Sequence, residues 1–221
     1  MEAQSRSTLA GAHPPDSPGL PRGRSKRPRE EARNAQIRRL FRAAIAAVAE
    51  KTYAATSVTD IVQRARVSRR EFYDYFNGKE DCFLAAALDG GFLLHNTLTE
   101  AERTAEPGGE LRAVIRSYLE LCKNEPEFAR CLLFEVLATG ERGWALHAAA
   151  YEEVGALLYR VAAKPGRAVG TRSRRVRQRA SLAAVGAVAE VTASYVGAGK
   201  YNQLGELEDD IVQVVERIFN K

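Results

Sequence analysis

Apolar positions recur with the 3.6-residue period of an α-helix along most of the chain, and no stretch alternates as a half-buried strand would. The first such stretch, residues 31–51, carries the stripe Ile37, Leu40, Phe41, Ala44, Ile45 and Val48. The same period predicts further helices over residues 79–104, 111–123, 127–139, 144–163, 172–197 and 206–220. The 221 residues are therefore predicted to fold as an all-α protein, with room for a small domain and a larger one.

Three candidate helix starts follow one another closely between residues 57 and 79. Each start pairs a side chain that can cap a first turn with an acidic residue three positions later. The pairs are Ser57 with Asp60, Ser68 with Glu71, and Asn77 with Glu80. Starts so close together predict two short helices joined by tight turns, followed by the beginning of a long helix.

The two short helices have distinct inner and outer faces. The inner positions are Val58, Ile61, Val62 and Ala65 in the first helix, and Phe72 and Phe76 in the second. The outer face of the second helix offers Ser68, Arg69, Arg70, Tyr73 and Tyr75. A short helix with a basic, hydroxylated outer face suits the major groove of DNA. The alternative is a solvated helical hairpin, since charge on an exposed face usually serves only solvation.

Positive charge is concentrated in the same part of the chain. Between Arg22 and Lys79 there are 15 Lys or Arg and 6 Asp or Glu, a net +9, whereas the rest carries 18 against 22, a net −4. This asymmetry favours a polyanionic partner for this end of the chain only.

Residues 1–28 are rich in Pro, Gly and Ser and poor in apolar residues, so they are predicted to form a disordered basic arm. The basic residues at its end, Arg24, Lys26 and Arg27, either lie along DNA phosphates and the minor groove or only solubilise the tail.

The helices after residue 80 form a larger, mostly apolar region with a few polar residues in it. Candidate effector-binding residues are Leu94, Leu98, Tyr118, Cys122, Phe128, Cys131, Glu135, Trp144, His147, Tyr151 and Glu190. Glu135 stands out because it lies in a nearly all-apolar helix, and a buried carboxylate needs a partner such as His147 or a bound cation. For each polar residue the alternative is an ordinary structural hydrogen bond.

The last two predicted helices, which include residues 181–197 and 206–220, could form a four-helix bundle with those of a second copy. The alternative is that they are ordinary core helices of one chain. The only cysteines, Cys82, Cys122 and Cys131, have no paired spacing, which favours buried thiols in a reducing cytoplasm over disulfides or a metal site. A thiol sensor that uses Cys122 and Cys131 stays open. No signal peptide, membrane-spanning helix, catalytic motif or cofactor motif is predicted.

The segment 33–83 resembles the N-terminal domain of the TetR family of bacterial transcriptional regulators. The residues that carry the resemblance are Ala49-Glu50-Lys51, Tyr53 to Val58, Asp60-Ile61, Ala65, Val67-Ser68, Phe72-Tyr73, Tyr75-Phe76 and Gly78 to Asp81. The resemblance implies a cytoplasmic homodimer that binds a double-stranded DNA operator, usually as a repressor, and commonly responds to a small molecule. It also implies phosphate contacts by Thr56, Thr59 and Lys79, base contacts by Arg69 and Arg70, and supporting contacts by Tyr73 and Tyr75.

Three residues depart from the family pattern. Thr52 and Arg66 stand where the family often has Gly, and Glu71 replaces a common Thr. If the turn keeps a left-handed backbone, Arg66 costs about 1–2 kcal/mol, which a phosphate contact could offset. Glu71 is expected to face the cap or to pair with an arginine.

These patterns predict an arm over 1–28, a three-helix helix-turn-helix DNA-binding domain over 29–80, and a helical effector-binding and dimerisation domain over 81–221. The function that they favour is a ligand-responsive repressor of a pseudo-palindromic operator, released by an apolar or amphipathic effector. An architectural DNA-binding protein and an all-helical enzyme with an appended DNA-binding head are the alternatives. Neither a metal nor a cofactor is expected.

Overall fold

The computed structural model describes residues 29–162 and 174–220, and every regular element in these ranges is helical. The predicted arm residues Arg24, Lys26 and Arg27 lie outside the described residues. The α-helices are α1 (Arg29–Lys51), α2 (Val58–Ala65), α3 (Arg69–Tyr73), α4 (Lys79–Thr104), α5 (Glu110–Asn124), α6 (Pro126–Arg130), α7 (Glu141–Ala162), α8 (Arg174–Gly197) and α9 (Glu208–Phe219). The predicted all-α fold is confirmed.

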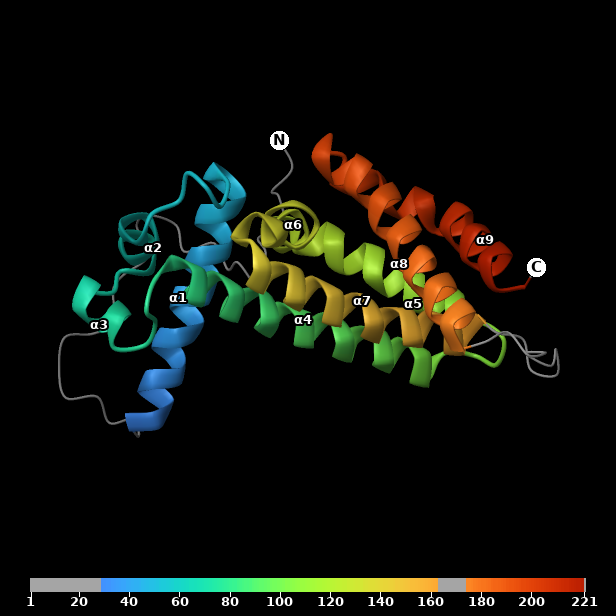
Figure 1. Ribbon diagram of the computed structural model, residues 1–221, viewed down its shortest axis with the longest axis horizontal. Coiled ribbons are helices and arrows are strands. Elements are labelled where there is room, and N and C mark those ends of the chain that lie inside the picture. Colours follow the sequence, from blue (N-terminus) through green and yellow to red (C-terminus); the bar gives the residue numbers. More distant parts are fainter. Residues whose placement is uncertain (1–28, 163–173, 221) are drawn as a thin grey trace.

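Helices α1, α2 and α3 gather at one end of the molecule, and the remaining helices extend away from them (Figure 1). Helices α4 and α7 run side by side along the larger part of the structure, and α8 and α9 pack beyond them. Two ion pairs, Arg142 with Asp81 and Arg160 with Glu102, join the two ends of α4 to α7. Helix α4 connects the two parts, because Cys82 near its start packs in the core of the three-helix unit, whereas Leu94 and Leu98 pack in the larger core.

The three-helix unit has its own small core. The buried members are Leu40, Ala43, Ala44, Ile61, Val62, Ala65, Val67, Phe72 and Cys82. Most of the inner positions predicted for α2 and α3 belong to this core. Burial of each large apolar side chain stabilises the fold by about 1.5–3 kcal/mol. Phe76 is only half-buried and packs at the edge of this core.

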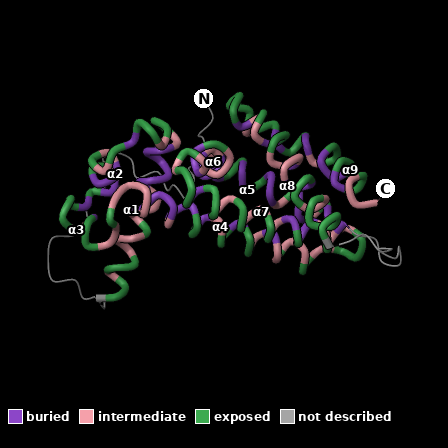
Figure 2. The backbone as a smooth tube through the Cα atoms, in the orientation of Figure 1, coloured by how far each residue is buried: buried purple, intermediate pink, exposed green. Residues whose placement is uncertain are grey.

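Helix α1 takes part in both cores. Its residues Ile45, Ala46 and Val48 belong to the larger core, which also contains Phe83, Leu94, Phe128 and the buried residues of α5, α8 and α9. Buried residues follow the junction between α1 and the larger part in Figure 2. The proposed domain boundary at residue 80 therefore lies at the start of α4, whereas side chains of α1 pack in the cores of both parts.

The helix predicted over 127–139 is more irregular than its apolar pattern suggested. It consists of α6, a π-helical turn over Cys131–Glu135 and a 3-10 turn over Val136–Thr139. Burial all round was also expected, but Phe134 is exposed. Phe128 packs against Gly90, where an added Cβ would lie 2.1 Å from the Phe128 ring, so this glycine allows α6 to approach α4 closely.

Two other predictions need correction. Asn77 does not cap the long helix with Glu80, since its backbone N–H and side-chain amide both donate to Asp81. The last helix begins at Glu208 after a 3-10 turn, rather than at Glu206. In α9, Ile211, Val212 and Val215 are buried, whereas Val214 is exposed.

Candidate DNA-binding site and its link to the helical domain

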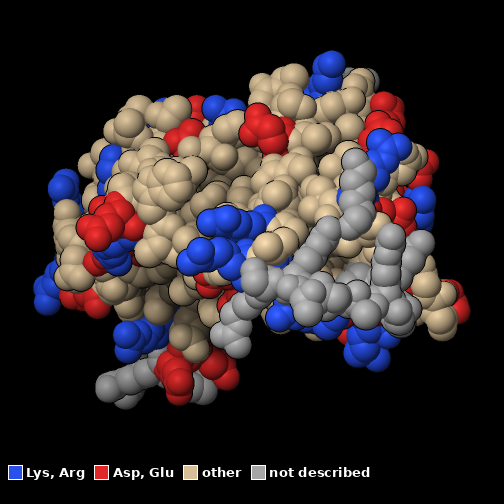
Figure 3. All heavy atoms as spheres, turned by 45° about the vertical axis from the view of Figure 1, so that its right-hand side comes forward, with Lys and Arg blue, Asp and Glu red and all other residues tan. Residues whose placement is uncertain are grey.

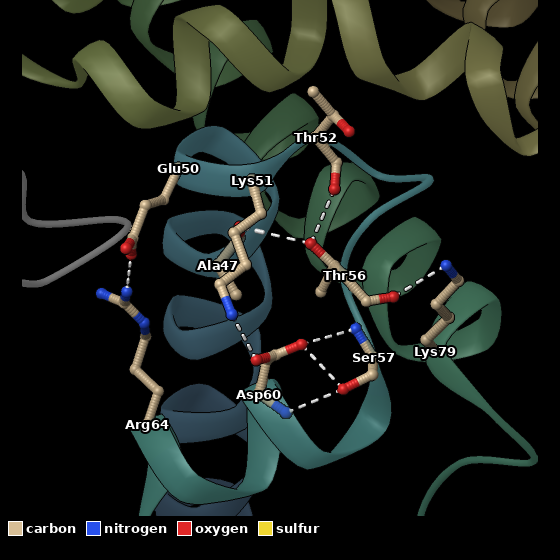
Figure 4. Close-up of polar contacts among 9 residues, drawn as sticks. All are labelled: Ala47, Glu50, Lys51, Thr52, Thr56, Ser57, Asp60, Arg64 and Lys79. Carbon is tan, nitrogen blue, oxygen red and sulfur yellow. Dashed lines mark hydrogen bonds and ion pairs between the residues drawn. The ribbon is translucent and has the colours of Figure 1, made fainter.

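Helix α2 begins with a complete capping box. The Ser57 side chain accepts from the Asp60 N–H, and the Asp60 carboxylate accepts from the Ser57 N–H and hydroxyl (Figure 4). Lys51, the last residue of α1, donates to the same carboxylate at 2.6 Å. The hydrogen bond from Lys51, followed by those from Ser57, holds the Asp60 pKa well below its usual value. The start of α2 is thereby fixed to the end of α1.

The predicted capping box of α3 is also confirmed. Glu71 accepts from the Ser68 N–H at 3.0 Å and returns its own N–H to the Ser68 hydroxyl, and Gln36 of α1 donates to it at 3.1 Å. The Ser68 hydrogen bonds lower the Glu71 pKa. Glu71 thus faces the cap, as expected, and pairs with no arginine among the described residues.

The outer face of α3 is exposed and basic. Ser68, Arg69, Arg70 and Tyr73 are all exposed, as is Thr59 near the start of α2. The Arg69 guanidinium lies over the Tyr73 ring, 5.8 Å from its centroid. These five residues are free to meet a partner surface.

Tyr75, in contrast, belongs to the inner side of the unit. Its hydroxyl donates to the Gln36 side chain at 2.6 Å, its ring packs at the edge of the small core, and Arg33 lies over that ring. The outward position predicted for Tyr75 is therefore wrong. The structure instead makes Tyr75 a contact between the end of α3 and the first half of α1.

Thr56 and Lys79 are placed to hold the loop between α1 and α2. Thr56 is only 3% exposed, and its hydroxyl donates to the carbonyl oxygens of Ala47 and Thr52 (Figure 4). Lys79 donates from Nζ to the carbonyl oxygens of Tyr53 at 2.8 Å, Ala54 at 3.3 Å and Thr56 at 2.8 Å. In this structure both side chains bond to backbone carbonyl oxygens, whereas the family resemblance assigns a phosphate contact to each.

Thr52 and Arg66, the two departures from family glycines, are the only non-glycine residues with positive φ in the described parts of the chain. Thr52 has φ 81°, and Arg66 has φ 53° and ψ 44°, so the turn between α2 and α3 does keep its left-handed backbone. Both conformations favour glycine because a Cβ crowds the following carbonyl oxygen.

The buried Glu135 carboxylate finds its partner in the loop before α2. Glu135 is 7% exposed and accepts from the Tyr53 N–H at 2.7 Å. Of the alternatives left open for Glu135, the structure shows the ordinary structural hydrogen bond, and no group of three or more potential metal-ligating side chains occurs among the described residues. At the first residue of the π-helical turn that contains Glu135, the Cys131 thiol donates to the Ile45 carbonyl oxygen of α1. The π-helical turn thus bonds directly to the three-helix unit.

A buried polar group lies inside the larger domain, where effector contacts were predicted. Tyr118 and Cys122 of α5 are buried, and the Tyr118 hydroxyl interacts with the Cys122 thiol and with Thr192 of α8. Burial raises the Tyr118 pKa strongly and the Cys122 pKa to about 12. Tyr151 of α7 lies near enough for its charge to affect Tyr118, so three helices contribute to this cluster.

The other predicted effector residues divide between interior and surface. Leu94, Leu98, Phe128 and Cys131 are buried, and His147 and Tyr151 are half-buried with their rings 4.0 Å apart. Trp144 is 59% exposed and Glu190 is also exposed, so the apolar surroundings predicted for these two are wrong. Desolvation lowers the His147 pKa.

All three cysteines are free and buried, as predicted. Desolvation raises the pKa of Cys82 to about 12 and also raises that of Cys131. Reactive sensor thiols are accessible and have lowered pKa values, so the structure does not support a thiol sensor at Cys122 and Cys131.

Three polar residues of the site escaped the sequence analysis. Gln36 joins α1 to α3, Arg142 joins α7 to Glu80 and Asp81 at the start of α4, and Thr192 faces Tyr118. Thr192 lies on a largely apolar helical face, and that pattern could have identified it. Nothing local marks Arg142, because its partners are 61 and 62 residues away.

Comparison with known proteins adds to these observations. Residues 40–86 match the family model described as bacterial regulatory proteins, tetR family. Similar solved structures include the fatty acid degradation regulator FadR from Bacillus halodurans, with 18% identity, a TM-score of 0.71 and coverage of 87% of this chain and 97% of that one.

Two further structures show the same fold. FadR from Bacillus subtilis in complex with stearoyl-CoA has 19% identity and a TM-score of 0.66, over 80% of this chain and 96% of that one. A putative transcriptional regulator from Pseudomonas aeruginosa PAO1 has 20% identity and a TM-score of 0.68, over 88% and 97%. The helix-turn-helix unit of this chain thus matches the model of the tetR family of bacterial regulatory proteins, and the chain shares its whole fold with these solved structures.

Proposed function

We propose that the protein is a homodimeric, ligand-responsive repressor that binds a pseudo-palindromic DNA operator in the cytoplasm. The observation that carries the proposal is the direct bond between Glu135 of the helical domain and Tyr53 of the DNA-binding unit. A change in the helical domain that moves the π-helical turn must move or break this bond. In this proposal residues 29–80 bind the DNA, and the domain from residue 81 binds the effector. The protein has no enzymatic role and needs no metal or cofactor.

The exposed face of α3 supplies the base contacts in this proposal. Arg69 and Arg70 reach base edges in the major groove, where an arginine binds guanine through two acceptors. Ser68, Thr59 and Tyr73 contact the DNA backbone, and the arm residues Arg24, Lys26 and Arg27 extend the contacts along the duplex. Tyr75, Thr56 and Lys79 keep a supporting role, since the structure directs them into the unit.

Replacement of Arg70 by Ala tests the reading face. Arg70 is exposed and contacts no acidic residue among those described, so its loss is expected to leave folding unchanged. Operator affinity is expected to fall by about 1–3 kcal/mol, with relaxed specificity at one base pair. Selection of binding sequences from a random pool, followed by titration of the selected duplex, measures both. Arg103→Ala, at the far end of α4, is the control; equal affinity of both variants would contradict the assignment.

Homodimerisation is proposed through α8 and α9. Helix α8 has the length and composition of a possible membrane span over Arg175–Gly197, with a mean hydropathy of 1.3, yet only 28% of that window is buried. Its exposed apolar residues include Val176, Leu182 and Val191, and α9 adds Val214. Exposed residues run along both helices in Figure 2, and wide uncharged areas separate the charged groups on the face in Figure 3.

A second copy is a better cover for this surface than a membrane. The first turns of α8 carry the exposed Arg175, Arg177 and Arg179, and one side of the helix packs on α7 and α9. One short recognition helix binds DNA weakly, whereas a two-fold dimer presents two of them to a palindromic site.

The proposed effector is an amphipathic molecule with a long apolar part. The structurally similar Bacillus subtilis FadR is in complex with stearoyl-CoA, which motivates a fatty acyl thioester as the first ligand to test. In this chain the buried Tyr118, Cys122 and Thr192 would meet the polar atoms of such a ligand, and Leu94, Leu98, Phe128 and Cys131 would border its chain. His147 and Tyr151 lie beside this group.

The link through Glu135 gives the proposal a direct test. A ligand acts only through its different affinity for the two arrangements of the domains. Glu135→Leu removes the acceptor of the Tyr53 N–H, so it should weaken the effect of the ligand on DNA binding, whereas Glu135→Gln keeps an acceptor oxygen and should retain most of it. The measurement is operator affinity with and without stearoyl-CoA for each variant.

The outcomes separate the parts of the proposal. If no acyl thioester or fatty acid weakens operator binding by the wild-type protein, this effector class is wrong. If Glu135→Leu responds as strongly as the wild type, the signal does not pass through the Tyr53 bond.

A further inference from the structure

The reading helix α3 is too short to keep a fixed direction by itself. It contains five residues, Arg69–Tyr73, and Phe72 is the one among them that is buried. An isolated helix of this length is not stable in water, so its direction depends on the elements around it. One buried side chain holds the helix in place but does not by itself prevent its two ends from tilting. The direction of Arg69 and Arg70 therefore depends on further contacts at the ends of α3.

A single side chain of α1, Gln36, makes such contacts at both ends. Its amide nitrogen donates to the Glu71 carboxylate at 3.1 Å, in the capping box at the start of α3. Its amide oxygen accepts from the hydroxyl of Tyr75 at 2.6 Å, two residues past the end of α3. Arg33, three residues before Gln36 on α1, lies over the Tyr75 ring, 5.7 Å from its centroid. One amide thus joins α1 to the start and to the end of the reading helix.

The chemistry of the three side chains fixes the direction of both hydrogen bonds. An ionised carboxylate only accepts, so the half of the Gln36 amide that meets Glu71 must be its NH2 group. The amide oxygen then faces Tyr75, whose hydroxyl must donate. All three side chains are half-buried, and hydrogen bonds to a charged group are stronger there than in water. A change of donor or acceptor at any one of the three positions therefore leaves a group without its partner or brings like charges together.

We propose that Gln36 is a positioning residue of the DNA-binding unit, which sets the direction of α3 relative to α1 and thereby the specificity of its base contacts. The inference deepens the proposed DNA-binding function and rests on it. Binding groups must be held to within about 0.5 Å and 10–20° of their productive geometry. A tilt of α3 would therefore weaken base contacts by Arg69 and Arg70 more than contacts to phosphate charge, which carry no sequence information. Glu71 stands where a Thr is common in the family, so the family pattern does not supply the acceptor for Gln36.

The test compares two DNA duplexes of equal length, using the full-length protein. One is the duplex that the wild type selects from a random pool, and the other has a mixed sequence. Gln36→Leu keeps a side chain of similar size but loses both hydrogen bonds. Affinity for the selected duplex is expected to fall by about tenfold, the equivalent of one hydrogen bond to a charged group, with little change for the mixed duplex. Tyr75→Phe removes one oxygen and should give a smaller loss in the same direction. Gln203→Leu, the same substitution at an exposed position of the 3-10 turn before α9, is the matched control.

Two complementary changes distinguish positioning from a purely structural role. Gln36→Glu alone places a carboxylate against Glu71, and the like charges should reduce specific affinity at least as much as Gln36→Leu does. Addition of Glu71→Gln restores the pattern of donors and acceptors without a further change in net charge relative to the wild type. The amide at position 71 then accepts from the Ser68 N–H and donates to the carboxylate at position 36, whose second oxygen accepts from Tyr75. The double variant should regain most of the specific affinity.

The outcomes separate this inference from the function on which it rests. If the wild type selects no sequence and binds both duplexes equally, sequence-specific DNA binding fails and the inference fails with it. If the wild type selects a duplex, but Gln36→Leu and Tyr75→Phe keep its ratio of specific to non-specific affinity, the positioning role is overturned while DNA binding stands. The same holds if these variants lower only the melting temperature. A double variant that folds with a wild-type melting temperature but regains no specific affinity would also overturn the inference. Tyr75→Phe and the double variant keep the test decisive if Gln36→Leu does not fold.

Discussion

At the scale of single residues, this DNA-binding unit combines strong local caps with two disfavoured backbone positions. The capping boxes at Ser57 and Ser68 each stabilise a first turn by about 1 kcal/mol. Against them stand Thr52 and Arg66, whose positive φ values suit glycine. The two disfavoured residues differ in one respect. Arg66 places a positive charge on the surface, whereas Thr52, the residue after α1, carries no charge.

Replacement of Thr52 by Gly is therefore expected to stabilise the protein. A β-branched residue at φ 81° is strained, and its release should raise the free energy of unfolding by about 1 kcal/mol. The small loss is the weak 3.5 Å hydrogen bond from the Ala55 N–H to the Thr52 hydroxyl. Urea denaturation of the two proteins measures the difference. Ala55→Gly, in the same loop at negative φ, should instead destabilise, and stabilisation by both changes would refute the strain argument.

Local signals in the sequence were enough to predict these residue-scale features. Side chains three residues apart define the caps, and glycine positions in the family pattern mark the left-handed backbone. The roles of Lys79 and Glu135 could not be predicted in this way, because their partners lie 23 to 26 and 82 residues away. Lys79 illustrates the difference well: its position in the sequence suggested a phosphate contact, yet the fold brings three carbonyl oxygens within its reach.

At the scale of elements, the loop between α1 and α2 is the point where three parts of the molecule meet. Lys79 at the start of α4 donates to carbonyl oxygens of this loop, and the Thr56 hydroxyl donates from the loop to α1. Glu135 of the π-helical turn accepts a hydrogen bond from the Tyr53 N–H of the same loop. Helical periodicity predicted the helices on each side, but not this loop's contacts or the π-helical turn, since both depend on packing between distant elements. A displacement of the start of α4 or of the π-helical turn would therefore act directly on this loop.

The variant Lys79→Met separates this structural role from a phosphate contact. Loss of the ammonium leaves three carbonyl oxygens without their donor, so the free energy of unfolding should fall by about 1.5–3 kcal/mol. The salt slope of DNA binding should stay within error of the wild type, because a group already bonded to carbonyl oxygens neutralises no phosphate. Titrations at several salt concentrations, together with urea denaturation, measure both quantities. A slope reduced by about one unit with unchanged stability would restore the phosphate role.

At the scale of the whole molecule, the unusual feature is the apolar surface left by α8 and α9. The sequence pattern identified these helices as candidates for dimerisation, but it did not predict how little of α8 the single chain would bury. Helical periodicity reports which residues share a face, whereas the partner of that face depends on the tertiary arrangement. An interface between the α8 and α9 helices of two copies would relate their two α3 helices by a two-fold axis, which the proposed function requires.

The decisive variant for this surface is Val191→Asp. Val191 is exposed in the single chain, so the substitution should leave the fold intact, whereas a carboxylate enclosed between two α8 helices would be desolvated without a partner. A penalty of about 3 kcal/mol for each buried carboxylate would weaken dimerisation by more than a hundredfold. Analytical ultracentrifugation should then detect a monomer at concentrations where the wild type is a dimer. Phe92→Asp, which places the same charge at an exposed apolar position of α4, should remain dimeric. The affinity gained from two half-sites disappears when the subunits separate. A monomeric variant that still bound a palindromic site with wild-type affinity would therefore show that DNA binding does not depend on dimerisation through α8 and α9.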